Sequence, residues 1–164
     1  MPKKKDSLLN VNLSVSATQN PDGTWQNLTT TYSQGVTEPP SPGVVGANGD
    51  IDLSRFQDPD GQYGPATDII ITLSNCNVVD KFGNSLNMIY APQGNNQITF
   101  TGRDAASQFV RAVGSGSNIA VAFTDTDTES GDYHYCLNLW GYEVGHRPPQ
   151  GYPLPLDPKI VNPG

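Results

Sequence analysis

Apolar and polar side chains alternate strictly in the first strand-like part of the chain. Residues 9–17 read L-N-V-N-L-S-V-S-A, with an apolar side chain at every odd position. Because successive side chains of a strand point to opposite faces, this period of two predicts a strand with one buried face. The turn sequence Asn20-Pro21-Asp22-Gly23 follows. The run over residues 25–32 therefore predicts the second strand of a hairpin.

Further strand-like runs recur along the rest of the chain, separated by segments rich in glycine, proline and asparagine. The run I-I-I-T-L within residues 68–79 predicts a central strand buried on both faces or nearly so. Residues 34–49 contain prolines and glycines that cannot sustain a strand ladder, so they predict a long loop. The other predicted strands cover residues 51–56, 85–90, 98–100, 117–124, 133–144 and 159–161. Residues 117–124 and 133–144 are expected to pair antiparallel, and 159–161 to form a short edge strand.

One segment admits either a short helix or a strand. In residues 104–114, Asp104 is placed to cap a helix that Gly114 would end, with Phe109, Ala112 and Val113 on one face. The competing interpretation is a strand over residues 108–113. We favour the helix.

Composition agrees with strands and turns rather than helices. The sixteen acidic residues comprise thirteen Asp and three Glu, and the chain holds 17 Gly and 14 Pro. Asp favours turns and caps, whereas Glu favours helix interiors. We predict an all-β fold, an antiparallel β-sandwich of the immunoglobulin-like or jelly-roll-like kind with about seven to nine strands and at most one short helix. A flexible basic tail is expected over residues 1–7 and a single domain over residues 8–164.

Charge and hydropathy exclude some partners. The formal net charge is −7, and Lys3, Lys4 and Lys5 lie in the predicted tail, so the folded part is more acidic still. An acidic surface is a poor match for nucleic acid. No run of eighteen apolar residues is present, and no apolar signal-peptide core follows the lysines. We therefore expect a cytoplasmic protein that neither binds nucleic acid nor inserts into a membrane.

The two cysteines are open to two interpretations. Cys76 and Cys136 both lie in strand-like runs, as the inter-sheet disulfide of an immunoglobulin fold would require. The tyrosine that precedes the second cysteine by two residues in that fold is replaced here by His134, and a tryptophan on the strand after the first cysteine is missing. Two reduced, partly buried thiols are the plainer interpretation for a cytoplasmic chain.

The acidic turn before residues 133–144 is the best candidate for a metal site. Four carboxylates occur within eight residues, at Asp125, Asp127, Glu129 and Asp132. Hard oxygen ligands on a turn suit calcium. The spacing departs from an EF-hand, because the glycine comes one place late and the acid at position twelve is absent. We favour an acidic hairpin that keeps a strand edge soluble over calcium binding, and no other cofactor is expected.

Aromatic residues near the C-terminus suggest a stacking platform. Trp140, Tyr142 and Tyr152 are candidates for binding sugar rings or a proline-rich peptide. Alternation places Trp140 and Tyr142 on one face of the predicted strand and Tyr133 and Tyr135 on the other, so part of the aromatic set is expected in the core.

No catalytic motif accompanies these features. His134 and His146 are the only histidines, and neither lies in a recognisable nucleophile motif. We therefore predict a non-enzymatic binding or assembly module that either binds a protein partner or self-associates through edge strands. A carbohydrate-binding, lectin-like module assisted by calcium is the alternative. A hydrolase built on Asp58, Asp60 and His146 is the third candidate.

Overall fold

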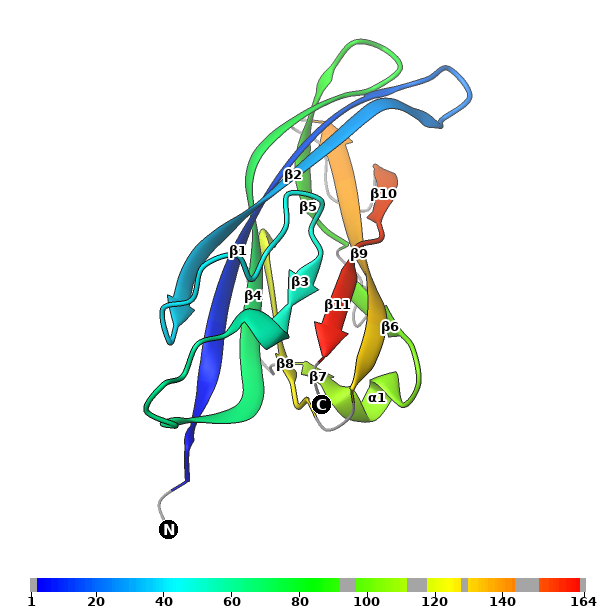
Figure 1. Ribbon diagram of the computed structural model, residues 1–164. Helices are drawn as coiled ribbons and strands as arrows, with labels where there is room; N and C mark the ends of the chain where they lie inside the picture. Colours follow the sequence, from blue (N-terminus) through cyan, green and yellow to red (C-terminus); the bar gives the residue numbers. More distant parts are fainter. Residues whose placement is uncertain (1–2, 92–96, 112–117, 128–129, 144–150, 163–164) are drawn as a thin grey trace.

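The computed structural model describes residues 3–91, 97–111, 118–127, 130–143 and 151–162, and strands dominate it (Figure 1). Within these ranges two short helical segments are present, the 3-10 turn η1 (Leu53–Arg55) and α1 (Ala105–Gln108). The all-β class is therefore confirmed. The strands are β1 (Lys5–Gln19), β2 (Trp25–Glu38), β3 (Ile51–Asp52), β4 (Tyr63–Val79), β5 (Ser85–Tyr90), β6 (Ile98–Thr101), β7 (Phe109–Arg111), β8 (Ala120–Asp125), β9 (Gly131–Glu143), β10 (Tyr152–Leu156) and β11 (Lys159–Asn162).

All eleven strands belong to one hydrogen-bonded sheet that curls around its own inner face (Figure 1). The main path runs β2-β1-β4-β5-β9-β11-β3. Strands β8 and β7 continue from β4, and β6 and β10 pair with β9. The prediction of a purely antiparallel arrangement is wrong, because β1 pairs parallel with β4 and β11 pairs parallel with β3. Parallel neighbours need a crossover connection, and the chain between β1 and β4 is long enough to supply one.

The predicted hairpin at the start of the chain is confirmed. Strands β1 and β2 pair antiparallel along most of their length. The N–H of Gly23 donates to the carbonyl of Asn20 at 2.9 Å, and Gly23 has φ +89°, which glycine adopts at no steric cost. From Ser7 onward the odd-numbered side chains of β1 all face the core, including Leu9 and Leu13 at 0% exposure.

The core fills the concave side of the curled sheet. Strand β4 lies between β1 and β8 and contributes Ile69 and Ile71, both fully buried, while Ile70 on its other face is half-buried. Strands β9, β10 and β11 form the wall opposite β1 and β4, and they supply the other side of the core. The largest fully buried side chains are Tyr90, Tyr135, Phe123, Leu9, Leu13, Ile51, Ile69, Ile71, Leu137, Leu139, Leu154 and Ile160.

The strands exceed the predicted number because two short ones, β7 and β10, lack an alternating pattern long enough to predict them. The proline-punctuated segment after residue 150 contains β10, which tolerates Pro153 and Pro155 because it pairs with β9 on one side. Strands β8 and β9 do not pair with each other as predicted, since β8 pairs with β4 and β7. The segment 104–114 is divided, with one helical turn followed by β7, and the Asp104 side chain makes no capping hydrogen bond.

Two predicted boundaries move for reasons of pairing. Strand β1 begins at Lys5, inside the predicted tail, because Lys5 and Ser7 already pair with β4. Strand β2 continues to Glu38, so the loop predicted from residue 34 begins only at Pro39. Ala112, Val113 and Gly114 of the predicted helix lie outside the described residues.

The turn between β4 and β5 is held by a buried carboxylate. The Asp80 side chain is 2% exposed, and its Oδ1 accepts hydrogen bonds from the N–H groups of Phe82 at 2.9 Å and Asn84 at 2.8 Å. Burial alone would raise the pKa of Asp80. The N–H donors of Asn84 and Phe82 outweigh it and hold the pKa below the ordinary 3.8.

A pH-dependent contribution to stability follows from this carboxylate. Because its folded-state pKa is lowered, the stabilisation is present above the unfolded-state pKa and is lost as the pH falls through the folded-state value. We expect Asp80→Ala to lower the free energy of unfolding by about 1–3 kcal/mol at pH 7. Urea denaturation of both proteins between pH 7 and pH 2 should show the difference shrinking below the ordinary carboxyl pKa. A difference that stays constant over that range would refute the assignment.

Candidate functional site

Strand β2 lies at one end of the sheet, so its outer edge has no strand partner among the described residues. The N–H of Tyr32 donates to the carbonyl of Ala47 at 3.2 Å, on the side away from β1. Tyr32 lies opposite Leu13, and Thr30 lies opposite Val15. The two pairs are two residues apart, so their backbone groups point in the same direction in an antiparallel ladder. The N–H and C=O groups of Thr30 therefore also point away from β1. Among the described residues no group hydrogen-bonds to them.

The second half of β2 is covered, which leaves the first half as the open part. The Gln34 side chain accepts hydrogen bonds from the N–H groups of Val44 at 2.8 Å and Val45 at 3.1 Å, and it donates to the carbonyl of Ser41. These contacts fold the loop after Pro39 back along β2. The open edge is thus residues 25–31, a length of about 20 Å. A β-bulge at Asn27 interrupts it, so residues 28–31 form its regular part.

A groove of about 260 Å³ runs beside this open edge, between β2 and the connection from β10 to β11. Leu28 is 44% exposed. One end of β2 is joined to β10 by the Trp25 side chain, whose Nε1–H donates to the carbonyl of Pro153 at 3.0 Å. The groove is lined by Leu28, Thr30, Tyr32, Asn48, Pro155, Leu156, Asp157 and Pro158.

The two strands that flank the groove differ in what their backbones offer. Pro153 and Pro155 of β10 carry no N–H, and the outward carbonyl of Pro153 already accepts from Trp25. The β10 edge is therefore protected against a further strand. Strand β2 has neither a proline nor a charged residue before Glu38, so the only edge protection within its open part is the β-bulge at Asn27, where φ is +54°.

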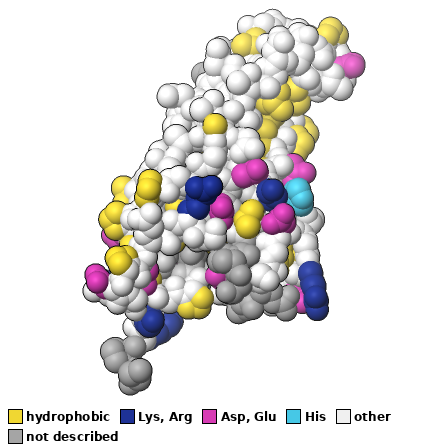
Figure 2. Space-filling view, viewed as in Figure 1, with side chains coloured by type: hydrophobic (Ala, Val, Ile, Leu, Met, Phe, Trp, Pro, Cys, Tyr) yellow, Lys and Arg dark blue, Asp and Glu magenta, His cyan; other side chains and the backbone are white. Residues whose placement is uncertain are grey.

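Charged side chains are sparse on the part of the molecule that carries this edge. Figure 2 shows the arm formed by the β1–β2 hairpin almost entirely white and yellow, while Asp, Lys, Arg and His side chains gather over the region of β3 and β11. The ion pair between Arg55 Nε and Asp52 at 3.3 Å lies at η1. The face of the arm seen in Figure 2 therefore carries little of the net charge of −7.

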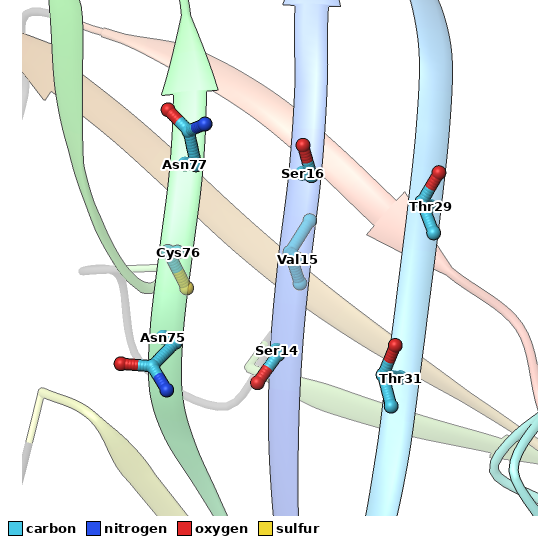
Figure 3. Close-up of a pocket in the computed structure, with 8 residues that line it drawn as sticks. All are labelled: Ser14, Val15, Ser16, Thr29, Thr31, Asn75, Cys76 and Asn77. Atoms are coloured by element: carbon cyan, nitrogen blue, oxygen red, sulfur yellow. The ribbon is translucent and has the colours of Figure 1, made fainter.

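The outer face of the same arm holds a second depression, of about 230 Å³ (Figure 3). Three neighbouring strands each supply two small polar side chains: Ser14 and Ser16 on β1, Thr29 and Thr31 on β2, and Asn75 and Asn77 on β4. None is charged. The pairing of β1 with β4 shifts register between Leu13 and Val15, which places the amides of β4 beside the hydroxyls of β1.

The predicted aromatic residues are only partly brought together. Trp140 and Tyr142 are half-buried neighbours on one face of β9. Tyr152 begins β10 and lies opposite Gly141, so it shares the other face and packs against the core. A common platform of all three residues is not formed on one face of the sheet.

The predicted calcium ligands are spread over the end of β8 and the start of β9. Asp125 is fully buried, and its Oδ1 accepts the N–H of Asp127 at 2.9 Å. Asp132 is exposed and lies opposite Val161 of β11. Within the described part of the chain no three His, Cys, Asp or Glu side chains are grouped to hold a metal. Glu129 lies outside that part, so the calcium site stays a prediction.

The two cysteines and the aspartates of the predicted hydrolase occupy places that the fold explains. Cys76 and Cys136 are free thiols on β4 and β9, and burial raises the pKa of each. Both carboxylate oxygens of Asp58 accept backbone N–H groups, from Gln62 and Tyr63 at 3.0 Å each. That geometry is an ordinary turn. Asp60 is exposed in the same turn, and His146 of the predicted hydrolase lies outside the described residues.

The open edge of β2 was not among the predicted site residues. Backbone groups carry it, so no side-chain motif marks it. One signal was present, because the chain from Thr24 to Thr37 contains no charged residue and no proline in a protein with sixteen acidic side chains.

Comparison with known proteins adds no family. No family model matches the chain, and no curated protein matches it. Five chains of solved structures match. One is the inclusion body protein PixA from Burkholderia cenocepacia, with 10% identity over 98% of both chains and a TM-score of 0.37. Similarity at that level carries no argument about this chain. No helix in the described residues is long and apolar enough to cross a membrane.

Proposed function

We propose that this protein is a non-enzymatic assembly module of the cytoplasm that associates through the open edge of β2. The observation that carries the proposal is the outward N–H and C=O of Thr30, on a strand segment without charge or proline. Such an edge is a template for a further strand, because each new backbone hydrogen bond satisfies groups that otherwise need water. The groove beside it receives side chains of the added strand.

The surroundings of the candidate chemical groups support a non-enzymatic role. A raised pKa keeps the thiols of Cys76 and Cys136 protonated near neutral pH, where the thiolate is the reactive form. The carboxylate of Asp58 is occupied by its own turn. The chain is thus proposed to act by contact with another polypeptide.

Blocking the edge tests this function. Thr30→Pro removes the outward N–H without removing a hydrogen bond to β1, and prolines are tolerated on sheet edges. We expect it to weaken self-association at least tenfold in sedimentation equilibrium, whereas Thr30→Val, which keeps the N–H, should associate like the wild type. Leu28→Lys retains the backbone but adds a charge to the edge, and it should weaken association as well. Association that is unchanged in both Thr30→Pro and Leu28→Lys would exclude the β2 edge.

A carbohydrate-binding module is the second candidate. It is favoured by the depression of Figure 3, whose hydroxyl and amide groups suit neutral ligands with many hydroxyls. A ligand that binds the native state raises the melting temperature by mass action. A sugar panel that shifts the wild-type protein but not Asn75→Ala/Asn77→Ala would support this candidate, and an absence of any shift would remove it.

A further inference from the structure

We infer that the partner of the β2 edge is the β2 edge of a second copy, so that two chains join their sheets antiparallel about a two-fold axis. This inference rests on the proposed function and names its partner. A strand added to β2 must itself bring an unprotected edge of comparable length. The question is which strand of this chain offers one.

The other edge strands of the described residues are short, protected or already paired on both sides. Strand β10 is protected by Pro153 and Pro155. Strands β3, β7 and β6 have two, three and four residues. Strand β11 is enclosed between β9 and β3. Among the described strands, residues 25–31 of β2, which the bulge at Asn27 interrupts, form the longest remaining edge without a proline or a charged residue.

Charge and side chains at this edge agree with contact between two copies. Each copy brings a segment with no charged residue, so two such segments meet without the like-charge repulsion expected between other parts of these acidic molecules. Leu28, 44% exposed, would be covered together with its symmetry mate. Its burial removes apolar surface from water on both chains at once.

Symmetry decides the size of the assembly. When the same patch serves both partners, the contact is isologous and closes at two chains. When β2 pairs with some other surface, the contact is heterologous and each chain retains a free end. The two cases differ in how a chain with a blocked β2 edge behaves toward an intact one.

A capture experiment with full-length chains separates them. Tagged wild-type protein is mixed with untagged wild type, Thr30→Pro or Thr30→Val, equilibrated, and recovered on the tag. We expect untagged wild type and Thr30→Val to be recovered equally and Thr30→Pro to be reduced at least tenfold. Recovery of Thr30→Pro at the wild-type level would show that another surface of the variant binds β2 of the tagged chain. That result would overturn the symmetric pairing but not the proposed function. Failure to recover untagged wild type at any concentration would overturn both. Circular dichroism spectra that match the wild type establish that each variant is folded.

Discussion

Replacing Phe123 by alanine is expected to lower the free energy of unfolding by about 3–5 kcal/mol. Phe123 is 1% exposed on β8, and its ring packs edge-on against Phe100 at a centroid distance of 4.9 Å and Phe109 at 6.2 Å. Phe100 and Phe109 stack at 4.3 Å. Truncation leaves a cavity in this cluster as well as removing buried apolar surface, and both effects are destabilising.

Phe82 provides the matched control for this substitution. Its ring is 70% exposed in the turn between β4 and β5, so Phe82→Ala should change the free energy of unfolding by less than about 0.5 kcal/mol. Guanidinium denaturation of the two variants measures the contrast. Equal midpoints for Phe123→Ala and Phe82→Ala would mean that the aromatic cluster is not packed as described.

Replacing Gly49 by alanine is expected to cost about 2–4 kcal/mol, from two causes. Gly49 has φ +89°, a conformation that disfavours side chains, and a Cβ there would lie 2.7 Å from the buried ring of Tyr32. Its carbonyl also accepts the hydroxyl of Tyr135 at 2.6 Å, so the backbone has little freedom to move. The substitution disturbs the wall of the groove beside β2.

Gly23 separates the two causes. It has the same φ of +89°, but a Cβ there would meet nothing within 4 Å. Gly23→Ala should therefore show the backbone strain alone, about 1–2 kcal/mol, and Gly49→Ala should exceed it by the cost of overpacking against Tyr32. Thermal or denaturant unfolding of both variants gives the comparison. Equal losses would place Tyr32 away from Gly49.

The sequence predicted the local structure better than the order of the strands. Period-two alternation over residues 9–17 identified β1 and its buried face, and the Asn20–Gly23 turn identified the hairpin. Alternation reports which face of a strand is buried, but it does not say which strand lies beside it. The parallel pairing of β1 with β4 and the separation of β8 from β9 arise from long-range packing, for which local patterns hold no signal.

The candidate site was hidden for a related reason. Side-chain motifs predicted sites at the acidic turn after β8 and at the aromatic residues of β9. The β2 edge offers backbone groups, which every residue carries, and its exposure depends on where the loop after Pro39 and the prolines of β10 are placed. The absence of charge from Thr24 to Thr37 marked the segment, but the same composition suits a strand with neighbours on both sides.

Amide hydrogen exchange at Thr30 tests the central claim most directly. Its N–H points outward from β2, so it should exchange quickly in dilute protein and slowly once a second strand accepts it. We expect its exchange rate to fall as the protein concentration rises, while the rate at Tyr32, which already donates to Ala47, stays unchanged. If the protein associates as its concentration rises but the exchange rate at Thr30 does not change, assembly through this edge is contradicted.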